Sequence, residues 1–260
     1  MEQRLNFALD TARQAGEILR RGFGHVADIQ LKGTVDLVTE HDLASEQFIR
    51  QAIESTYPDD AILAEEEGSL GEGEYRWLID PLDGTTNFAH RMPIFSISIA
   101  YARGNQAILG VVYDPMRDEL FHALQGQGAF LNGHPLAVSQ TEQLINSLVV
   151  TGFPYDKHTN PDNNLNHFAD LMMKTRGIRR LGSAALDLCY VAAGRFDAYW
   201  ELRLWPWDWA AGILIAREAG GTVTNIHGGE AIFDERASLL ATNGRLHQAM
   251  LDLLNAESSS

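Results

Sequence analysis

Residues 77–87 read WLIDPLDGTTN, a stretch that places two carboxylates directly after an apolar segment. The apolar part is typical of a buried strand, and we expect the strand to end at Pro81 because proline cannot donate to a ladder. Asp80 and Asp83 are therefore predicted to lie at a strand tip. Asp83 is expected to cap the turn or helix that follows, and free amides at Gly84 would face a bound anion. Carboxylates on one side and amides on the other predict a slot for a metal ion and a phosphate.

Two other stretches place acidic residues in the same local setting. Glu65 follows the apolar strand predicted over residues 61–64, and Asp208 opens a predicted helix after the strand-like residues 199–204. The ends of strands in one sheet can converge on one crevice. Oxygen ligands suit Mg²⁺, and two such ions about 4 Å apart can clamp a phosphate while they activate water. The carboxylates therefore suit metal-assisted hydrolysis of a phosphate ester.

Each of these interpretations has a simpler alternative. Asp-Pro and Asp-Gly dipeptides are ordinary turn formers. Thr39 and Asp42 match a helix capping box and need do nothing else, residues 65–67 fit a solvated charge run, and Asp208 fits a helix cap. Glu201, on a predicted strand, would then lie on the surface. The tryptophans are expected to pack rather than to bind a base, at positions 200, 205, 207 and 209.

Composition limits the class of protein. The 260 residues are 45% hydrophobic, which is enough for one large unit or two closely packed ones. A formal net charge of −15 argues against general affinity for nucleic acid or anionic membranes, although residues 176–180 could form a local basic patch. Cys189, the single cysteine, is expected to be a buried core thiol. Without an apolar run of about 18 residues or a signal peptide, we expect a cytoplasmic protein.

The order of predicted elements indicates an α/β protein with two sheets in layers. The first half begins with a helix over residues 5–23 and contains an antiparallel meander over residues 94–124. The second half interleaves helices and strands. The composition changes near residues 139–147 without a linker, so we expect halves 1–145 and 146–260 within one compact unit. The other predicted strands cover residues 27–31, 35–38, 61–64, 148–150, 197–204 and 222–224, and the other helices 39–57, 164–174, 183–193 and 208–219.

Two longer motifs resemble the signature motifs of the inositol monophosphatase family. They are residues 77–88 and residues 207–212, which read WDWAAG. Further matches occur in family order at residues 35–42, 65–66, 113–115, 126–133, 182–185 and 218–221. The resemblance covers nearly the whole chain. It implies a layered αβαβα sandwich, phosphomonoesterase activity that depends on two or three Mg²⁺ ions, sensitivity to Li⁺, and commonly a homodimer.

The resemblance implies that two metal ions share a set of acidic ligands. Glu65, Asp80 and the backbone carbonyl of Leu82 would hold the first ion. Asp80, Asp83 and Asp208 would hold the second, so that Asp80 bridges the two.

The resemblance also implies roles around the phosphate. Asp42 and Thr85 match the pair that orients the attacking water, and the amides of Gly84 and Thr85 would bind the phosphate. Arg179 is a further candidate for contact with the substrate or with a second subunit. Positions that contact the hydroxyls of the sugar alcohol are matched by Asp83, Ala184 and Glu201.

This sequence departs from the family pattern at two places. Ala64 precedes Glu65 where the family often has glycine. Lys32-Gly33-Thr34 replaces a more usual polar run near the mobile loop that carries a third-metal site in the family. The first departure concerns the affinity for metal, because it lies next to the ligand Glu65. The second concerns the loop that would carry the third ion.

The motifs leave several functions open. The leading expectation is hydrolysis of myo-inositol 1-phosphate or a related polyol phosphate. Fructose-1,6-bisphosphatase, histidinol-phosphatase, NADP(H) phosphatase and nucleotide 3′-phosphatase activities share the metal site and differ in the pocket wall. A different class is a binding role with the transcription machinery, with or without catalysis.

Overall fold

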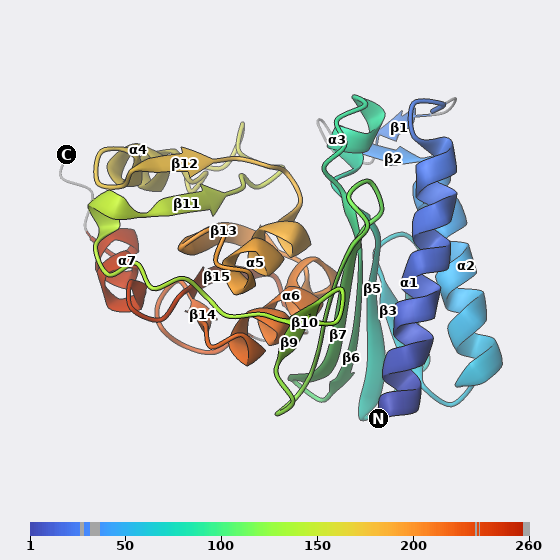
Figure 1. Cartoon of the computed structure of the whole chain (residues 1–260). Helices are drawn as coiled ribbons and strands as arrows, with labels where there is room; N and C mark the ends of the chain where they lie inside the picture. The colour runs from blue at the N-terminus through green and yellow to red at the C-terminus, as the bar shows by residue number, and fades with distance from the viewer. Residues whose placement is uncertain (27–28, 32–36, 232, 234, 257–260) are drawn as a thin grey trace.

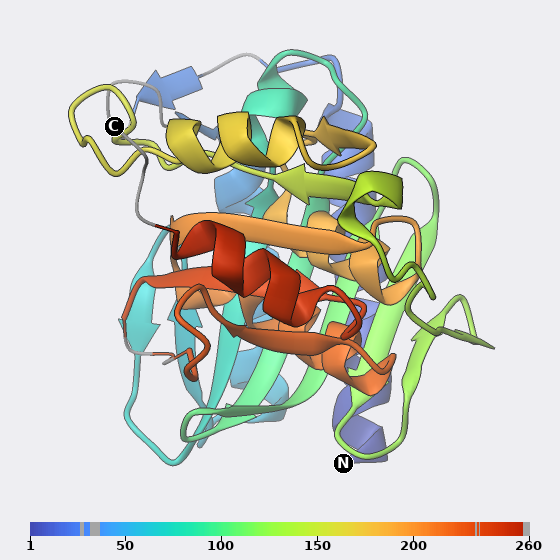
Figure 2. The ribbon, with the colours of Figure 1, turned by 90° about the vertical axis from the view of Figure 1, so that its left-hand side faces the viewer.

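Sheets and helices alternate in five layers in the computed structural model, which describes residues 1–26, 29–31, 37–231, 233 and 235–256. Figure 1 shows the layers from right to left, and Figure 2 shows the last pair of helices in front of the smaller sheet. In that order they are α1 (Glu2–Gly22) with α2 (Glu40–Thr56), an eight-stranded sheet, α5 (Ala184–Ala192) with α6 (Pro206–Glu218), a five-stranded sheet, and α4 (Leu165–Met172) with α7 (His247–Leu254). The αβαβα sandwich expected from the sequence is confirmed.

The larger sheet is antiparallel except where β3 runs parallel to β5. Its strands lie in the order β10 (His134–Pro135), β9 (Ala129–Leu131), β8 (Glu119–Leu124), β7 (Gln106–Asp114), β6 (Ser96–Arg103), β5 (Tyr75–Asp83), β3 (Ala61–Ala64) and β4 (Gly68–Leu70). A separate antiparallel pair is formed by β1 (Ile29–Leu31) and β2 (Leu37–Thr39). The predicted meander is therefore confirmed as β6, β7 and β8.

Small residues let the outer helix α1 approach the larger sheet. Ala8, Ala12 and Ala15 recur at helical spacing and are fully buried. At Gly16 a Cβ atom would lie 2.5 Å from the ring of Tyr113, so only glycine fits this contact without a shift. The first helix predicted from the sequence is thus present, and its packing depends on a small-residue face.

The middle layer is apolar on every side because sheets cover both of its faces. Every residue of α5 is buried, and α6 is buried except for Trp207 and Asp208 near its start and Arg217 and Glu218 at its end. A Cβ atom at Gly110 of β7 would lie 2.7 Å from the carbonyl oxygen of Ala211 in α6. This close approach holds α6, which carries Asp208 near its start, against the larger sheet.

The smaller sheet completes the fold. Its strands lie in the order β12 (Gly177–Arg179), β11 (Leu148–Thr151), β13 (Ala198–Leu204), β15 (Ala237–Thr242) and β14 (Thr222–Asn225). Trp200, Leu240 and Met250 pack with no exposed surface in the core between this sheet and the outer helices. All strands of the larger sheet lie before residue 136, and all strands of the smaller sheet lie after residue 147. The division of the chain at residue 145 stays a prediction.

Two of the predicted element boundaries that differ from the structure lie next to the carboxylates. The strand expected to end at Pro81 continues to Asp83, because the register against β6 shifts between Asp80 and Asp83. Such a bulge allows a proline to pass through a strand without a ladder hydrogen bond. The helix expected to open at Asp208 begins at Pro206.

Other predictions are confirmed or lie outside the described residues. Cys189 is buried, as expected for a core thiol. Of the two short strands predicted near the N-terminus, residues 29–31 and 37–38 are strands, while residues 27–28 and the stretch 32–36 lie outside the described part. None of the helices in the described part of the chain has both the length and the hydropathy that crossing a bilayer requires.

Candidate functional site

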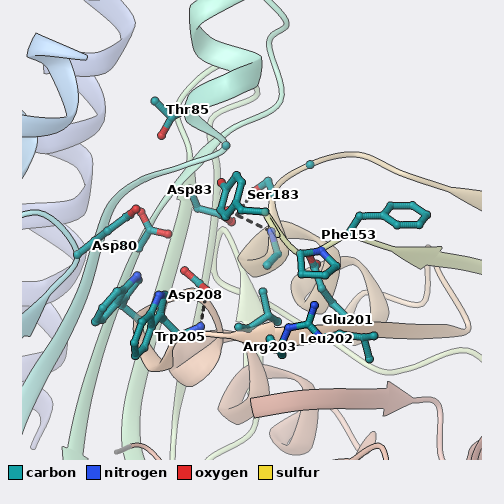
Figure 3. A pocket seen from close by; sticks show the side chains of 18 of the residues that line it. Asp80, Asp83, Thr85, Phe153, Ser183, Glu201, Leu202, Arg203, Trp205 and Asp208 are labelled. Atoms are coloured by element: carbon teal, nitrogen blue, oxygen red, sulfur yellow. Dashed lines mark hydrogen bonds between the residues drawn. The ribbon is translucent and has the colours of Figure 1, made fainter. Parts of the chain in front are cut away.

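A cavity of about 340 Å³ lies where the ends of β3, β5 and β13 meet the starts of α5 and α6. Figure 3 shows the side chains that line it. Among them are carboxylates from separate parts of the sequence, Glu65, Asp80, Asp83, Glu201 and Asp208. The expected convergence of these acidic residues is therefore observed, and their roles as ligands stay a prediction.

Asp83 caps a helix that lies 100 residues further along the chain. Its carboxylate accepts hydrogen bonds from the Ser183 hydroxyl at 2.6 Å, the Ala184 amide at 3.1 Å and the Ala185 amide at 2.8 Å. The two amides are free backbone donors at the start of α5, and Ser183 is its N-cap residue. The prediction that Asp83 caps the element directly after it was wrong, because Gly84 takes the N-cap position of α3 (Thr85–Ala89).

Burial opposes the negative charge of Asp83. It raises the pKa of this carboxyl to about 6, while the hydrogen bonds from Ser183, Ala185 and Ala184 act in the opposite direction. The carboxylate is therefore fixed in place by donors that favour its charged form.

Asp80 and Asp208 face the same cavity under mutual repulsion. Burial, and after it the charge of Glu65, raises the pKa of both carboxyls well above the usual range. Asp80 Oδ1 accepts the Leu82 amide at 3.0 Å, and Asp208 Oδ2 accepts the Trp205 amide at 2.7 Å. Asp208 therefore does cap its helix, as the simpler alternative held, and it faces the cavity as well.

The donor set fits a hard divalent cation. The charges that act most strongly on Asp80 and Asp208 are those of other carboxylates, so a cation would relieve the repulsion between them. In the part of the chain that the structure describes, no three acidic, histidine or cysteine side chains already form a metal-ligand cluster. Asp80, Asp83 and Asp208 are instead held by backbone amides. The remaining lone pairs of these carboxylate oxygens are the ones that would hold an ion.

Asp42 and Thr85 form a hydrogen-bonded pair. The Thr85 hydroxyl donates to Asp42 Oδ1 at 2.8 Å and lies 3.1 Å from the carbonyl oxygen of Leu82. The other oxygen of Asp42 accepts the Thr39 amide at 2.9 Å, which completes the predicted capping box of α2. Asp42 thus caps a helix and also positions a hydroxyl that lines the cavity.

Gly84 is required by its backbone conformation. Its φ of 103° lies in a region that side chains rarely adopt, and a Cβ atom there would lie 3.1 Å from the carbonyl oxygens of Gly182 and Ile94. The chain can therefore turn tightly from Asp83 into α3, with Gly84 and Thr85 both on the cavity wall.

The far wall of the cavity carries Glu201. Burial raises the pKa of its carboxyl to about 7, although the Tyr199 hydroxyl donates to it at 2.9 Å. A Cβ atom at Gly152 would collide with the Glu201 carboxylate, so glycine there leaves room for it. Ala184 lies on the cavity wall as predicted.

Arg180, rather than Arg179, lines the cavity. Arg179 is exposed at the end of β12, and its guanidinium donates to the carbonyl oxygen of Ile178. Neighbouring side chains along an extended chain point to opposite sides. The charge of Arg180 lowers the otherwise raised pKa of Glu201 and Asp187. The basic stretch 176–180 indicated this region. Only the alternation of side chains along the extended chain could have shown that Arg180, and not Arg179, faces the cavity.

Sequence reasoning missed part of the cavity wall. Trp200 and Trp209 are fully buried, as predicted for packing residues, but Trp205 is 40% exposed and lines the cavity together with Trp207. The packing prediction was therefore wrong for Trp205, whereas Trp207 is half-buried and packs on the Trp205 ring. Their positions one and three residues before Asp208 could have placed them beside the site. The other missed wall residues are Phe153, Pro154, Tyr155, Gly182, Ser183, Leu202, Arg203, Leu204 and Arg236.

Comparisons with known proteins agree with this geometry. The model of the inositol monophosphatase family matches residues 1–259. An inositol-1-monophosphatase of Synechocystis sp. is 47% identical over 255 residues, which cover 97% of this chain and 88% of the relative. The Nus factor SuhB of Pseudomonas aeruginosa is 46% identical over 259 residues, 96% of this chain and 95% of the relative. The solved structure of inositol monophosphatase from Anabaena has a TM-score of 0.89 at 43% identity, covering 97% of this chain and 95% of that chain.

Proposed function

Because the chain belongs to the inositol monophosphatase family, whose members hydrolyse phosphate monoesters, we propose that it converts myo-inositol 1-phosphate to inositol and phosphate with Mg²⁺ as cofactor. One observation carries the proposal. Glu65, Asp80, Asp83 and Asp208 line a single cavity that also contains Thr85, the partner of Asp42. An oxygen-rich cavity of this kind suits a cation and a phosphate together.

The proposed ligands divide into two overlapping sets. Glu65, Asp80 and the Leu82 carbonyl would hold one ion, and Asp80, Asp83 and Asp208 would hold another. A third ion remains part of the proposal. Bound Mg²⁺ would neutralise the phosphate and lower the pKa of a bound water.

The protein's own groups position the reactants. Since the Thr85 hydroxyl donates a hydrogen bond to Asp42, its oxygen can accept a hydrogen bond from the attacking water and orient that water toward phosphorus. The buried Asp42 carboxylate balances the positive charge that develops on that water. The amides of Gly84 and Thr85 would bind phosphate oxygens.

The hydroxyls of the polyol would contact the far wall. Glu201 offers carboxylate oxygens to them, with Asp83 and Ala184 beside it. Arg180 takes the place of Arg179 as the cation near the substrate, and Arg179 remains a candidate only for a subunit contact in a proposed homodimer. Inhibition by Li⁺ and a cytoplasmic location stay predictions.

Steady-state kinetics across a panel of monoesters test this function. We expect Mg²⁺-dependent turnover of inositol 1-phosphate that EDTA abolishes and Li⁺ inhibits. The rival substrates are fructose 1,6-bisphosphate, histidinol phosphate, NADP(H) and a nucleoside 3′-phosphate. If one of them is hydrolysed fast while turnover of inositol 1-phosphate is negligible, inositol 1-phosphate is rejected as the leading substrate.

A second candidate is a binding role in transcription. It is favoured by the 46% identity to a relative that carries the name Nus factor SuhB. A strain that carries only the Asp83→Asn protein tests it. If catalysis is lost and a transcription phenotype of the deletion is still complemented, the binding role is supported; loss of both assigns the phenotype to catalysis.

A further inference from the structure

One face of helix α2 carries polar side chains that are buried. Asp42, Ser45, Glu46 and Arg50 recur at helical spacing, and all four are buried. Polar side chains normally lie on the solvent side of a helix, and buried ones need hydrogen-bond partners. Helix α2 lies against the larger sheet beside β5 (Figure 1). These side chains therefore bind groups of the protein rather than solvent.

Glu46 holds the turn that carries Glu65. Its Oε2 accepts the amide of Glu66 at 2.8 Å, and its Oε1 accepts the amide of Glu67 at 2.7 Å. This turn joins β3 to β4. The amide of Glu65 itself donates to the carbonyl oxygen of Ile79 at 3.2 Å. The backbone at Glu65 is thus fixed to β5 on one side, and its turn is fixed to α2 on the other.

Arg50 binds the same turn further along the chain. Its guanidinium donates to the carbonyl oxygen of Gly68 at 3.2 Å and lies 3.2 Å from the carboxylate of Glu67. It also lies 3.8 Å from Glu46 Oε1, one helical turn away. Burial raises the pKa of the Glu46 carboxyl, and the amides of Glu66 and Glu67 and then the charge of Arg50 oppose that shift. The contacts of this buried carboxylate therefore converge on one turn.

The same face of α2 also reaches the bulge of β5. The Ser45 hydroxyl donates to the carbonyl oxygen of Pro81 at 2.9 Å, between the proposed ligands Asp80 and Asp83. One helix thus contacts both strand ends that supply ligands to the first ion. It sets the position of the turn that carries Glu65 relative to that bulge.

We propose that Glu46 is a positioning residue, which fixes the turn after β3 so that the Glu65 carboxylate is held ready for a divalent cation. The inference rests on the proposed function, in which Glu65 is a metal ligand. Glu46 is not among the described residues that line the cavity, so it acts through Glu65 rather than by contact with metal or substrate. A turn without this anchor would have to be ordered when the ion binds, and the cost of that ordering lowers the affinity.

The test measures the affinity for Mg²⁺ directly. Calorimetry follows the binding of Mg²⁺ to the metal-free wild type, Glu46→Gln, Glu65→Gln and the double variant. Glutamine has nearly the same shape as glutamate, but its amide nitrogen cannot accept the second backbone amide. We expect Glu46→Gln to raise the dissociation constant for Mg²⁺ about tenfold, as is typical when a group behind a metal ligand is lost. The double variant should bind no more weakly than Glu65→Gln, because Glu46 acts through Glu65.

Asp60→Asn is the matched control, because Asp60 lies at the other end of β3. Its carboxylate also accepts hydrogen bonds from groups distant in sequence, the side chains of Arg4, Trp77 and Tyr101. Loss of this network should lower the melting temperature and leave the dissociation constant for Mg²⁺ unchanged. Glu46→Asp keeps the charge on a shorter side chain and should bind Mg²⁺ with intermediate affinity. It decides the question if circular dichroism shows that Glu46→Gln does not fold.

The outcomes separate this inference from the proposed function. If Glu65→Gln weakens Mg²⁺ binding and Glu46→Gln does not, the positioning role is rejected and Glu65 stays a ligand. If Glu65→Gln binds Mg²⁺ as the wild type does, the ligand assignment in the proposed function fails, and the inference fails with it. An equal loss of affinity in Asp60→Asn, or a further loss in the double variant, would assign Glu46 to the stability of the fold alone.

Discussion

At the scale of single residues, Asp83 has a structural and a proposed chemical role in one side chain. It caps α5 through Ser183, Ala184 and Ala185, and it lines the cavity as a proposed metal ligand. An asparagine keeps one acceptor oxygen but loses the charge. We therefore expect Asp83→Asn to fold and to lose at least about 100-fold in kcat/KM for inositol 1-phosphate, since a lost ligand charge weakens metal affinity.

The matched control for Asp83→Asn removes a charge elsewhere. Asp170 is exposed on α4, so Asp170→Asn changes the net charge by the same amount and should keep wild-type kinetics. Circular dichroism checks folding, and an Mg²⁺ titration of the activity separates weak metal binding from misfolding. Near-normal turnover by Asp83→Asn at low Mg²⁺ would show that Asp83 is not a ligand.

At the scale of elements, the sequence predicted those features that depend on interactions between residues close together in the chain. The capping box of Thr39 and Asp42 and the buried strand before Glu65 were predicted because neighbours within four residues determine them. The cap made by Asp83 was missed because its partners at the start of α5 are distant in sequence. The passage of β5 through Pro81 was missed for the same reason, since the bulge depends on pairing with β6. The sequence therefore predicted the acidic residues and their local caps, but not the long-range contacts that hold Asp83.

Arg203 links the bulged end of β13 to the loop that forms another part of the cavity wall. Its backbone has φ 57°, which costs a non-glycine residue about 1 kcal/mol. Its guanidinium donates to Asp156 Oδ1 at 2.7 Å and to Asp162 Oδ2 at 3.0 Å, in the loop that carries Phe153 and Tyr155. Arg203 therefore combines a strained backbone next to the cavity with two ion pairs that hold the wall loop of Phe153 and Tyr155 in place.

We expect Arg203→Gly to raise KM for inositol 1-phosphate by roughly tenfold, the equivalent of about 1.4 kcal/mol of lost wall contacts. The melting temperature should change little, because glycine relieves the φ strain while two partly exposed ion pairs are lost. Arg203→Lys keeps the strain and one cation, so an intermediate KM is expected. Kinetics and thermal unfolding of both variants measure this, and a large loss of stability at unchanged KM would contradict the role.

At the scale of the whole molecule, the layers could be predicted but the strand order could not. The family motifs, in order along the chain, implied the αβαβα sandwich. In the smaller sheet, however, β15 (Ala237–Thr242) inserts between β13 and β14, and no strand was predicted there. Its sequence ASLLAT is poor in β-branched and aromatic residues, so its conformation depends on its two neighbours rather than on its own preference.

The cavity also links the stability of the whole molecule to pH. Burial raises the pKa of Asp83 to about 6 and of Glu201 to about 7, and it raises the pKa of Asp80 and of Asp208 well above the usual range. In the unfolded chain such groups ionise near pH 4. The folded metal-free protein therefore binds more protons than the unfolded chain above pH 4, and the stability contributed by these groups is lost as pH rises through about 6 to 7.

We therefore expect the metal-free protein in EDTA to melt at a lower temperature at pH 8 than at pH 5.5. Mg²⁺ should raise the melting temperature more at pH 8, because it binds the folded form with its carboxylates ionised. Asp187 is a matched control, since burial and the charges of Glu201 and Asp83 raise its pKa but it is not a proposed ligand. Asp187→Asn should stabilise the metal-free protein at pH 8 and leave the shift caused by Mg²⁺ unchanged. Thermal unfolding at equal ionic strength, at both pH values with and without Mg²⁺, measures these shifts. If Mg²⁺ raised the melting temperature equally at both pH values, metal binding would not depend on the ionisation of these carboxylates.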